Sequence, residues 1–186
     1  MIRIVPYDSH WPAQYAAEAA NVRAVLGDRA LRIEHVGSTS VPGLAAKLVI
    51  DIQVSVATLQ PLAPHSAQLG ELGYHHIPLG PFDNVYPFFQ KPAQWPSTHH
   101  VHLCVLGDEQ ERRHLAFRDY LRGHPAVAAE YAALKRTLAV DHDGATLASR
   151  ERYSSLKTGF IDSVLERAFT AGYPLSEDAL PRGQSR

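Results

Sequence analysis

The chain has 186 residues, of which 45% are hydrophobic, and this is enough apolar side chain for one core. Its 18 Lys and Arg against 19 Asp and Glu give a formal net charge of -1, so no overall field attracts bulk nucleic acid or an anionic membrane. The lone cysteine, Cys104, excludes an internal disulfide framework and a multi-cysteine zinc site.

The distribution of apolar residues predicts neither a membrane helix nor a signal peptide. No apolar run reaches the roughly 18 residues of a membrane helix, and the first residues lack the apolar stretch of a signal peptide. We therefore expect a cytoplasmic protein without membrane contact. Residues 1–170 are predicted to form one domain, and 171–186 have little apolar periodicity, which predicts a flexible C-terminal tail.

The first part of the chain predicts strands around one long helix. Residues 2–5 predict a short strand, a helix then ends near residue 26, and 32–36 predict a second strand. A proline opens a predicted short helix at 42–46. The clearest strand is 48–56, because its apolar and polar side chains alternate.

That alternation divides the strand into two faces. The apolar face carries Ile50, Ile52, Val54 and Val56, and the polar face carries Asp51, Gln53 and Ser55. We expect helices to pack on the apolar face and the polar face to line an open groove.

The second part predicts a hairpin, one more strand and a run of helices. A helix at 62–72 precedes paired strands at 74–79 and 84–90, a loop at 91–97, a strand at 99–106, and helices at 109–122, 125–139 and 149–170. The predicted fold class is α/β (α+β): a mixed sheet with helices mainly on one face and a C-terminal helical cluster.

A Gly37-Ser38 turn follows a predicted strand, and Asp51 comes after twelve intervening residues. This pattern resembles the nucleotidyltransferase signature, in which a Gly-Ser turn precedes a strand with acidic residues two positions apart. The turn offers N–H groups and a hydroxyl to phosphate, and carboxylates on one strand face can hold magnesium ions. Asp51 is accordingly the candidate catalytic residue.

Longer motifs resemble the GrpB family over nearly the whole chain. They are residues 35–47 with 50–52, 98–102, 114–121, 131–135, and 157–158 before 160–161. The resemblance implies a nucleotidyltransferase-like fold, and relatives occur fused behind dephospho-coenzyme A kinases. It therefore implies an enzyme or nucleotide-binding protein acting on an unknown acceptor.

Gln53 stands where a nucleotidyltransferase has its second carboxylate. An amide supplies no negative charge for a hard divalent cation, so Gln53 disfavours a two-magnesium mechanism. The alternative is a non-catalytic binding or regulatory module that keeps the fold.

His100 and His102 offer a partial replacement, because they alternate on the strand face opposite Val101 and Leu103. With Asp51 they would form a metal site that suits manganese, zinc or iron better than magnesium. Two other interpretations remain: both histidines are hydrogen-bonded sheet residues, or the strand is that of a histidine-triad hydrolase, whose third histidine would fall at Cys104.

A nucleotide or another phosphorylated small molecule is the predicted ligand. Gly37, Ser38, Lys47 and Lys157 are the candidate phosphate-binding residues, and Lys157 matches a lysine of the GrpB pattern. His35 and Gln53 are secondary candidates that adjoin the site. Residues 37–47 are not a P-loop, because five residues separate their glycines and Lys47 does not follow the second one.

Overall fold

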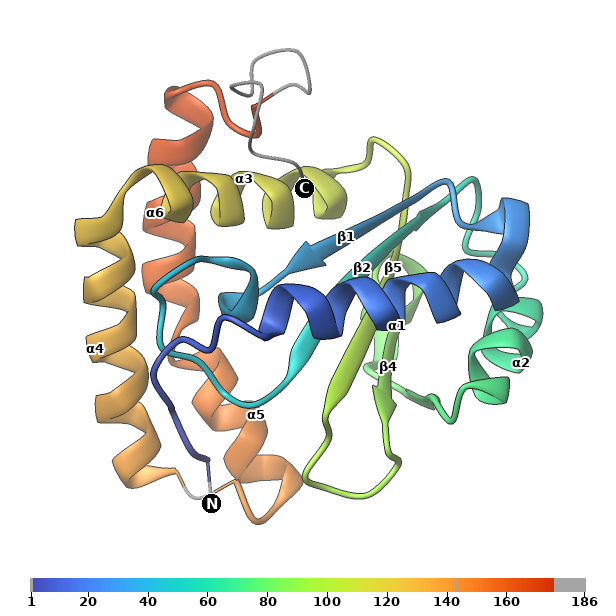
Figure 1. Ribbon diagram of the computed structural model, residues 1–186, viewed down its shortest axis with the longest axis horizontal. Coiled ribbons are helices and arrows are strands. Elements are labelled where there is room, and N and C mark those ends of the chain that lie inside the picture. Colours follow the sequence, from blue (N-terminus) through green and yellow to red (C-terminus); the bar gives the residue numbers. More distant parts are fainter. Residues whose placement is uncertain (1, 143, 176–186) are drawn as a thin grey trace.

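A computed structural model describes residues 2–142 and 144–175 (Figure 1). Most of the flexible tail predicted at 171–186 therefore lies outside the described residues. None of the helices in these two segments is long and apolar enough to cross a membrane.

The centre of the molecule is a five-stranded mixed sheet. Its strands are β1 (Arg32–Val36), β2 (Ile50–Val56), β3 (His75–Ile77), β4 (Phe88–Lys91) and β5 (His99–Val105). They lie in the order β1-β2-β5-β4-β3, with β2 and β5 parallel and the other neighbours antiparallel. The predicted mixed sheet and the predicted pairing of the β3–β4 hairpin are confirmed.

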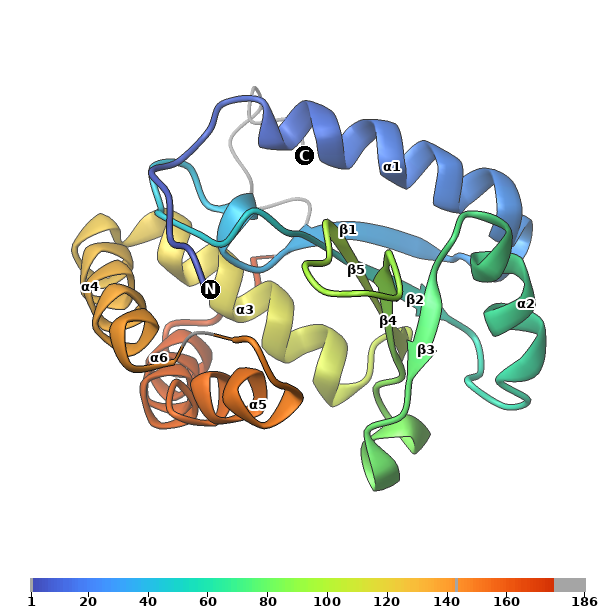
Figure 2. The same cartoon turned by 90° about the horizontal axis from the view of Figure 1, so that it is seen from below.

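Helices flank the sheet on both sides. They are α1 (Trp11–Leu26), α2 (Ala63–Glu71), α3 (Glu109–Gly123), α4 (Pro125–Asp141), α5 (Leu147–Ser155) and α6 (Thr158–Thr170). Helix α1 lies on one side of the sheet and α3 to α6 gather on the other (Figure 2). The predicted C-terminal helical cluster is thus confirmed, and it accounts for most of the helical residues.

Two apolar cores follow from this arrangement. The first lies between the sheet and helices α1 and α2, and contains Trp11, Leu69 and the apolar face of β2 and β5. The second joins α3, α4 and α6 to the loop after β1, and contains Leu44 and Val164. Burial of these side chains supplies the main driving force for folding.

Two predicted elements at the start of the chain are wrong. Residues 2–5 form no strand: Val5 makes only an isolated antiparallel bridge with Ala46, and Pro6 has no N–H to continue it. The helix predicted at 42–46 is absent because Gly43 has a φ of 79°, which a right-handed helix excludes.

The single helix predicted at 149–170 is also wrong, because it is two helices. Helix α5 ends at Ser155 and α6 begins at Thr158. The backbone tightens between them, where the Lys157 N–H donates to the Ser154 carbonyl. No proline marks the break, so composition gave no signal of it.

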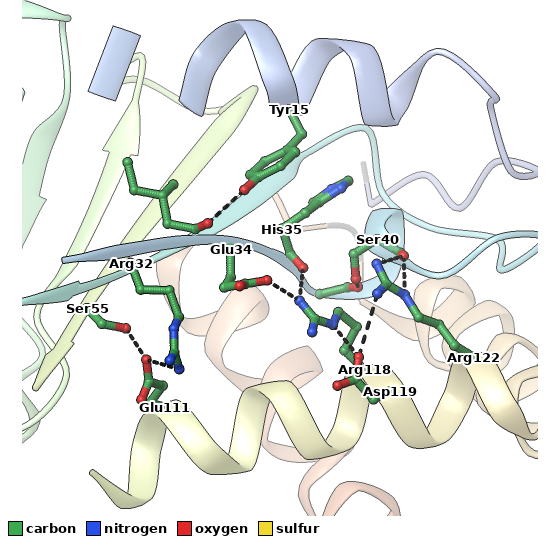
Figure 3. A network of polar contacts seen from close by, with 12 residues as sticks. Tyr15, Arg32, Glu34, His35, Ser40, Ser55, Glu111, Arg118, Asp119 and Arg122 are labelled. Carbon is green, nitrogen blue, oxygen red and sulfur yellow. Dashed lines mark hydrogen bonds and ion pairs between the residues drawn. The ribbon is translucent and has the colours of Figure 1, made fainter. Parts of the chain in front are cut away.

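Buried ion pairs hold α3 against β1 (Figure 3). The Arg118 guanidinium donates to Glu34 and to Asp119, each at 2.7 Å. All three side chains are less than 10% exposed. In this buried position, attraction between the guanidinium and the carboxylates compensates for their loss of hydration.

The same helix anchors the turn that follows β1. The Arg122 guanidinium donates twice to the Ser40 carbonyl, at 3.0 and 2.8 Å (Figure 3). The Ser40 hydroxyl in turn donates to the Gly37 carbonyl at 2.6 Å. Helix α3 thereby fixes the position of the Gly37-Ser38 turn.

Candidate functional site

The parallel pairing of β2 and β5 places Asp51 opposite His100 and Gln53 opposite His102. The Asp51 Oδ1 atom lies 3.0 Å from His100 Nδ1 and 3.8 Å from His102 Nε2. One donor atom from each of these three residues lies within 4.8 Å of the other two. The structure therefore brings together the three residues predicted from strand alternation, and we call them the Asp-His-His cluster.

Hydrogen bonds and burial set the charges of this cluster. Burial would raise the pKa of Asp51, but hydrogen bonds from His100 and His102 outweigh it and hold that pKa well below its usual value. Burial lowers the pKa of His100. The cluster thus combines a carboxylate with a neutral imidazole, which are the protonation states that bind a metal.

The second ring nitrogen of His100 also has a partner. His100 Nε2 lies 2.8 Å from the Ser97 hydroxyl. Because Nδ1 donates its hydrogen to the Asp51 carboxylate, Nε2 accepts from the Ser97 hydroxyl. A hydrogen-bonded second nitrogen of this kind orients histidine ligands in metal sites.

Gly37 lies directly against the Asp51 carboxylate. A Cβ atom at Gly37 would come within 2.4 Å of Asp51 Oδ2, and the φ of Gly37 is 68°. Both the close approach and the positive φ require glycine. The glycine of the Gly-Ser turn thus has a function the sequence did not indicate: it leaves room for the carboxylate.

The Asp-His-His cluster opens into a cavity of about 830 Å³. Cationic side chains line it as well: Lys47 from the loop before β2, Lys135 from α4, Lys157 from the α5–α6 break, and Arg150 from α5. We call Lys47, Lys135 and Lys157 the lysine group. Elements from both ends of the chain therefore meet at one cavity.

Burial and mutual repulsion both disfavour the positive charges of the lysine group. Burial, together with repulsion from the neighbouring lysines, lowers the pKa of Lys135 and of Lys157 to about 7. Burial also lowers the pKa of Lys47. In the described part of the chain, the lysine found in an ion pair is Lys91, with Glu18, and it does not line the cavity. Ammonium groups gathered in this way favour an anion among them.

Lys135 also contacts the predicted phosphate turn. Its Nζ donates to the Ser38 hydroxyl at 2.8 Å and to the Ala45 carbonyl. Only 3% of this residue is exposed. Lys135 therefore joins α4 to the turn that carries Ser38.

Comparison with known sequences assigns the family. Residues 1–167 match the GrpB family, described as GrpB protein. The chain belongs to the GrpB family. A crystal structure of the conserved protein GrpB from Enterococcus faecalis has a TM-score of 0.77 at 34% identity, and the match covers 91% of this chain and 98% of that one.

Three curated relatives match most of this chain. The UPF0157 protein PA4798 of Pseudomonas aeruginosa is 39% identical, over 98% of this chain and 74% of the relative. The UPF0157 protein YqkA of Bacillus subtilis is 38% identical over 76% of this chain. A dephospho-CoA kinase of Mycolicibacterium paratuberculosis is 33% identical over 90% of this chain. The matches span 40% of YqkA and 46% of the kinase.

In this GrpB family member, seven predicted site residues line the same cavity. They are Gly37, Ser38, Lys47, Asp51, His100, His102 and Lys157. Strand alternation and the family pattern together located them.

The two secondary candidates lie elsewhere. His35 is on the opposite face of the sheet, stacked on Tyr15 and 2.9 Å from the Thr39 hydroxyl. Gln53 shares the face of Asp51 but is 0% exposed, and α3 packs on this face through Glu111 against Ser55 and Arg118 against Glu34. The predicted open groove is therefore wrong at Gln53 and correct only at the end of the strands where Asp51 lies.

Several cavity residues of this GrpB chain were not predicted. Lys135 and His114 come from helices, where the two-residue alternation used for the strands gives no information. One signal was available for Lys135: it shares a helix face with the apolar Ala128 and the aromatic Tyr131, and a lysine on a core face is unusual.

Aromatic side chains form the remaining walls. Phe82, Tyr86, Phe88 and Trp95 line the cavity, whereas Phe89 is buried in the first core. The hydroxyl of Tyr86 is buried and has no hydrogen-bond partner in the described protein, and the same is true of Tyr153. A ligand or water in the cavity would satisfy these hydroxyls.

Proposed function

We propose that this chain is a metal-dependent enzyme that binds a nucleotide or a similar phosphorylated small molecule and transfers a nucleotidyl group to an acceptor. The observation that carries the proposal is the convergence of the Asp-His-His cluster and the lysine group on one cavity. A metal site and a cationic site facing each other suit the two ends of a metal–phosphate complex.

The composition of the cluster supports a particular choice of metal. One carboxylate and two imidazoles favour manganese, zinc or iron, whereas magnesium prefers oxygen ligands. Asp51 would contribute the negative charge, and His100 and His102 the neutral nitrogens. When bound, the metal would polarise a phosphoryl oxygen.

The remaining cavity residues have supporting roles in the proposal. Lys47, Lys135 and Lys157 would neutralise the phosphate oxygens, as cationic groups do in phosphoryl transfer. Ser38 would donate its hydroxyl to phosphate, with Lys135 holding it in place. Gly37 would keep the turn close to Asp51.

A second candidate function is a non-catalytic nucleotide-binding or regulatory module. It is favoured by Gln53, whose amide replaces the second carboxylate of the nucleotidyltransferase pattern and is fully buried. The match to a dephospho-CoA kinase is consistent with a GrpB region that accompanies another enzyme. Binding without turnover would support this function.

Calorimetric titration of a nucleoside triphosphate with Mn²⁺ tests the proposal. We expect Lys157→Met to weaken binding about 10- to 100-fold, because one charged hydrogen bond to phosphate contributes roughly 1.5–3 kcal/mol. Arg136→Met is the matched control, since Arg136 is exposed on α4 and does not line the cavity. Equal affinity in all three proteins, or no binding by the wild type, would contradict the proposal.

The pH dependence of triphosphate affinity is a separate prediction. The lowered pKa values of about 7 mean that Lys135 and Lys157 lose their protons as the pH rises above neutrality. An anion binds the protonated form, so affinity should fall between about pH 7 and pH 9. In Lys157→Met this fall should be shallower. Ionisation of the triphosphate affects both proteins equally. Identical slopes of affinity against pH would therefore show that triphosphate binding is not linked to protonation of Lys157.

A further inference from the structure

His114 is a cavity residue to which the proposed function assigns no part. It lies on α3 and lines the cavity. Its Nδ1 is 2.7 Å from the Gln110 carbonyl. A carbonyl oxygen only accepts hydrogen bonds, so Nδ1 carries the proton and Nε2 keeps its lone pair.

The ring of His114 lies beside the Asp-His-His cluster. Tyr86 stacks on both His114 and His102, with ring centroids 4.6 and 4.8 Å away. The His102 and His114 centroids are 6.2 Å apart. The two histidines of the cluster itself, His100 and His102, have centroids 6.3 Å apart. The His114 ring is thus as close to the His102 ring as the His100 ring is.

We propose that His114 is a further ligand of the metal held by Asp51, His100 and His102, binding through Nε2. The inference rests on the proposed metal site but not on the proposed reaction. A histidine ligand commonly donates its other ring N–H to a backbone carbonyl, and the Gln110 contact has that form. One carboxylate and three imidazoles form a site suited to zinc, manganese or iron.

This fourth ligand would change how the site works. His114 is not among the donor atoms that lie within 4.8 Å of one another, so the bound metal would draw its ring toward the cluster. Ligation from α3 would close the side of the metal that faces this helix. A ligand of this metal would then bind in the cavity that the lysine group also lines.

Cobalt(II) binding tests this assignment without any assay of turnover. The intensity of the visible cobalt bands reports the number and kind of ligands, because tetrahedral sites absorb strongly and octahedral sites weakly. We expect His114→Phe, which keeps a ring to stack on Tyr86, to weaken zinc and cobalt binding at least about tenfold and to change the cobalt spectrum. The affinities are measured by calorimetry.

His124→Phe is the matched control. His124 directly follows the end of α3 and makes a similar contact: its Nδ1 lies 2.8 Å from the Tyr120 carbonyl and its ring stacks on Tyr120. It does not line the cavity, so its replacement should leave metal affinity and the cobalt spectrum unchanged. Thermal unfolding of each metal-free protein shows whether the variants fold, and His114→Ala is the second variant if His114→Phe does not.

The outcomes separate this inference from the metal site on which it rests. A wild-type spectrum and affinity in both His114 variants, combined with loss of binding in Asp51→Asn, would overturn the role of His114 and leave the three-residue site intact. Absence of cobalt and zinc binding by the wild type would overturn both.

Discussion

Replacing Arg118 with methionine is expected to lower the free energy of unfolding by about 3–5 kcal/mol, because removing one partner of a buried ion pair leaves an uncompensated charge. The Arg118 guanidinium contacts both Glu34 and Asp119, and it is 3% exposed. Methionine fills similar volume but removes the guanidinium from Glu34, while Asp119 keeps its longer contact with Arg122 at 3.6 Å. Urea denaturation followed by circular dichroism measures the change.

Arg113→Met is the control for this experiment. Arg113 also lies on α3 and pairs with Asp162 at 2.9 Å, but the two side chains are 33% and 54% exposed. Surface ion pairs contribute only about 0–1 kcal/mol. Similar losses of stability in the two variants would show that the buried ion pairs of Arg118 stabilise the fold no more than a surface ion pair does.

Replacing Gly37 with alanine should reduce metal affinity roughly 100-fold, as displacement of groups that orient a ligand does. The added Cβ would meet the Asp51 carboxylate at 2.4 Å, so either the turn or the carboxylate must move. The positive φ adds about 1–3 kcal/mol of strain. Zinc or manganese titration measures the affinity, and urea denaturation measures the stability.

Gly43→Ala separates the clash from the backbone strain. Gly43 has a φ of 79°, but nothing lies within 4 Å of a Cβ atom placed there. We expect a loss of about 1–2 kcal/mol in stability and unchanged metal affinity. If Gly43→Ala weakened metal binding as much as Gly37→Ala, general destabilisation rather than displacement of Asp51 would explain both results.

Local patterns predicted the strands and the orientation of their side chains well. The alternation in 48–56 placed Asp51 on the polar face of its strand, and the alternation in 99–106 did the same for His100 and His102. In the structure Asp51 lies next to both histidines. That β2 and β5 are neighbours did not follow from local sequence. Their pairing depends on contacts between residues about fifty positions apart, with a whole hairpin between them.

The helical half of the cavity was mostly beyond local reasoning. Lys135 and His114 reach the cavity only because α3 packs on the sheet and α4 packs against α3, and tertiary packing leaves little trace in a single sequence. Lys157 was found through the family pattern. Its placement depends on the break between α5 and α6, and no proline marks that break.

The hairpin of β3 and β4 contributes to the cavity in two ways: β4 places Phe88 against His100 and His102, and the turn between the strands adds an exposed aromatic side chain. Its connecting segment, the 3₁₀ turn Gly80–Asn84, carries Phe82, which lines the cavity and is 58% exposed. Asp51 and His100 pair directly across β2 and β5, so the length and composition of this turn can change while the proposed metal ligands stay in register. Under the proposed function, we expect ligand preference to vary with this turn, and exchange of the 80–84 segment between related chains should transfer that preference.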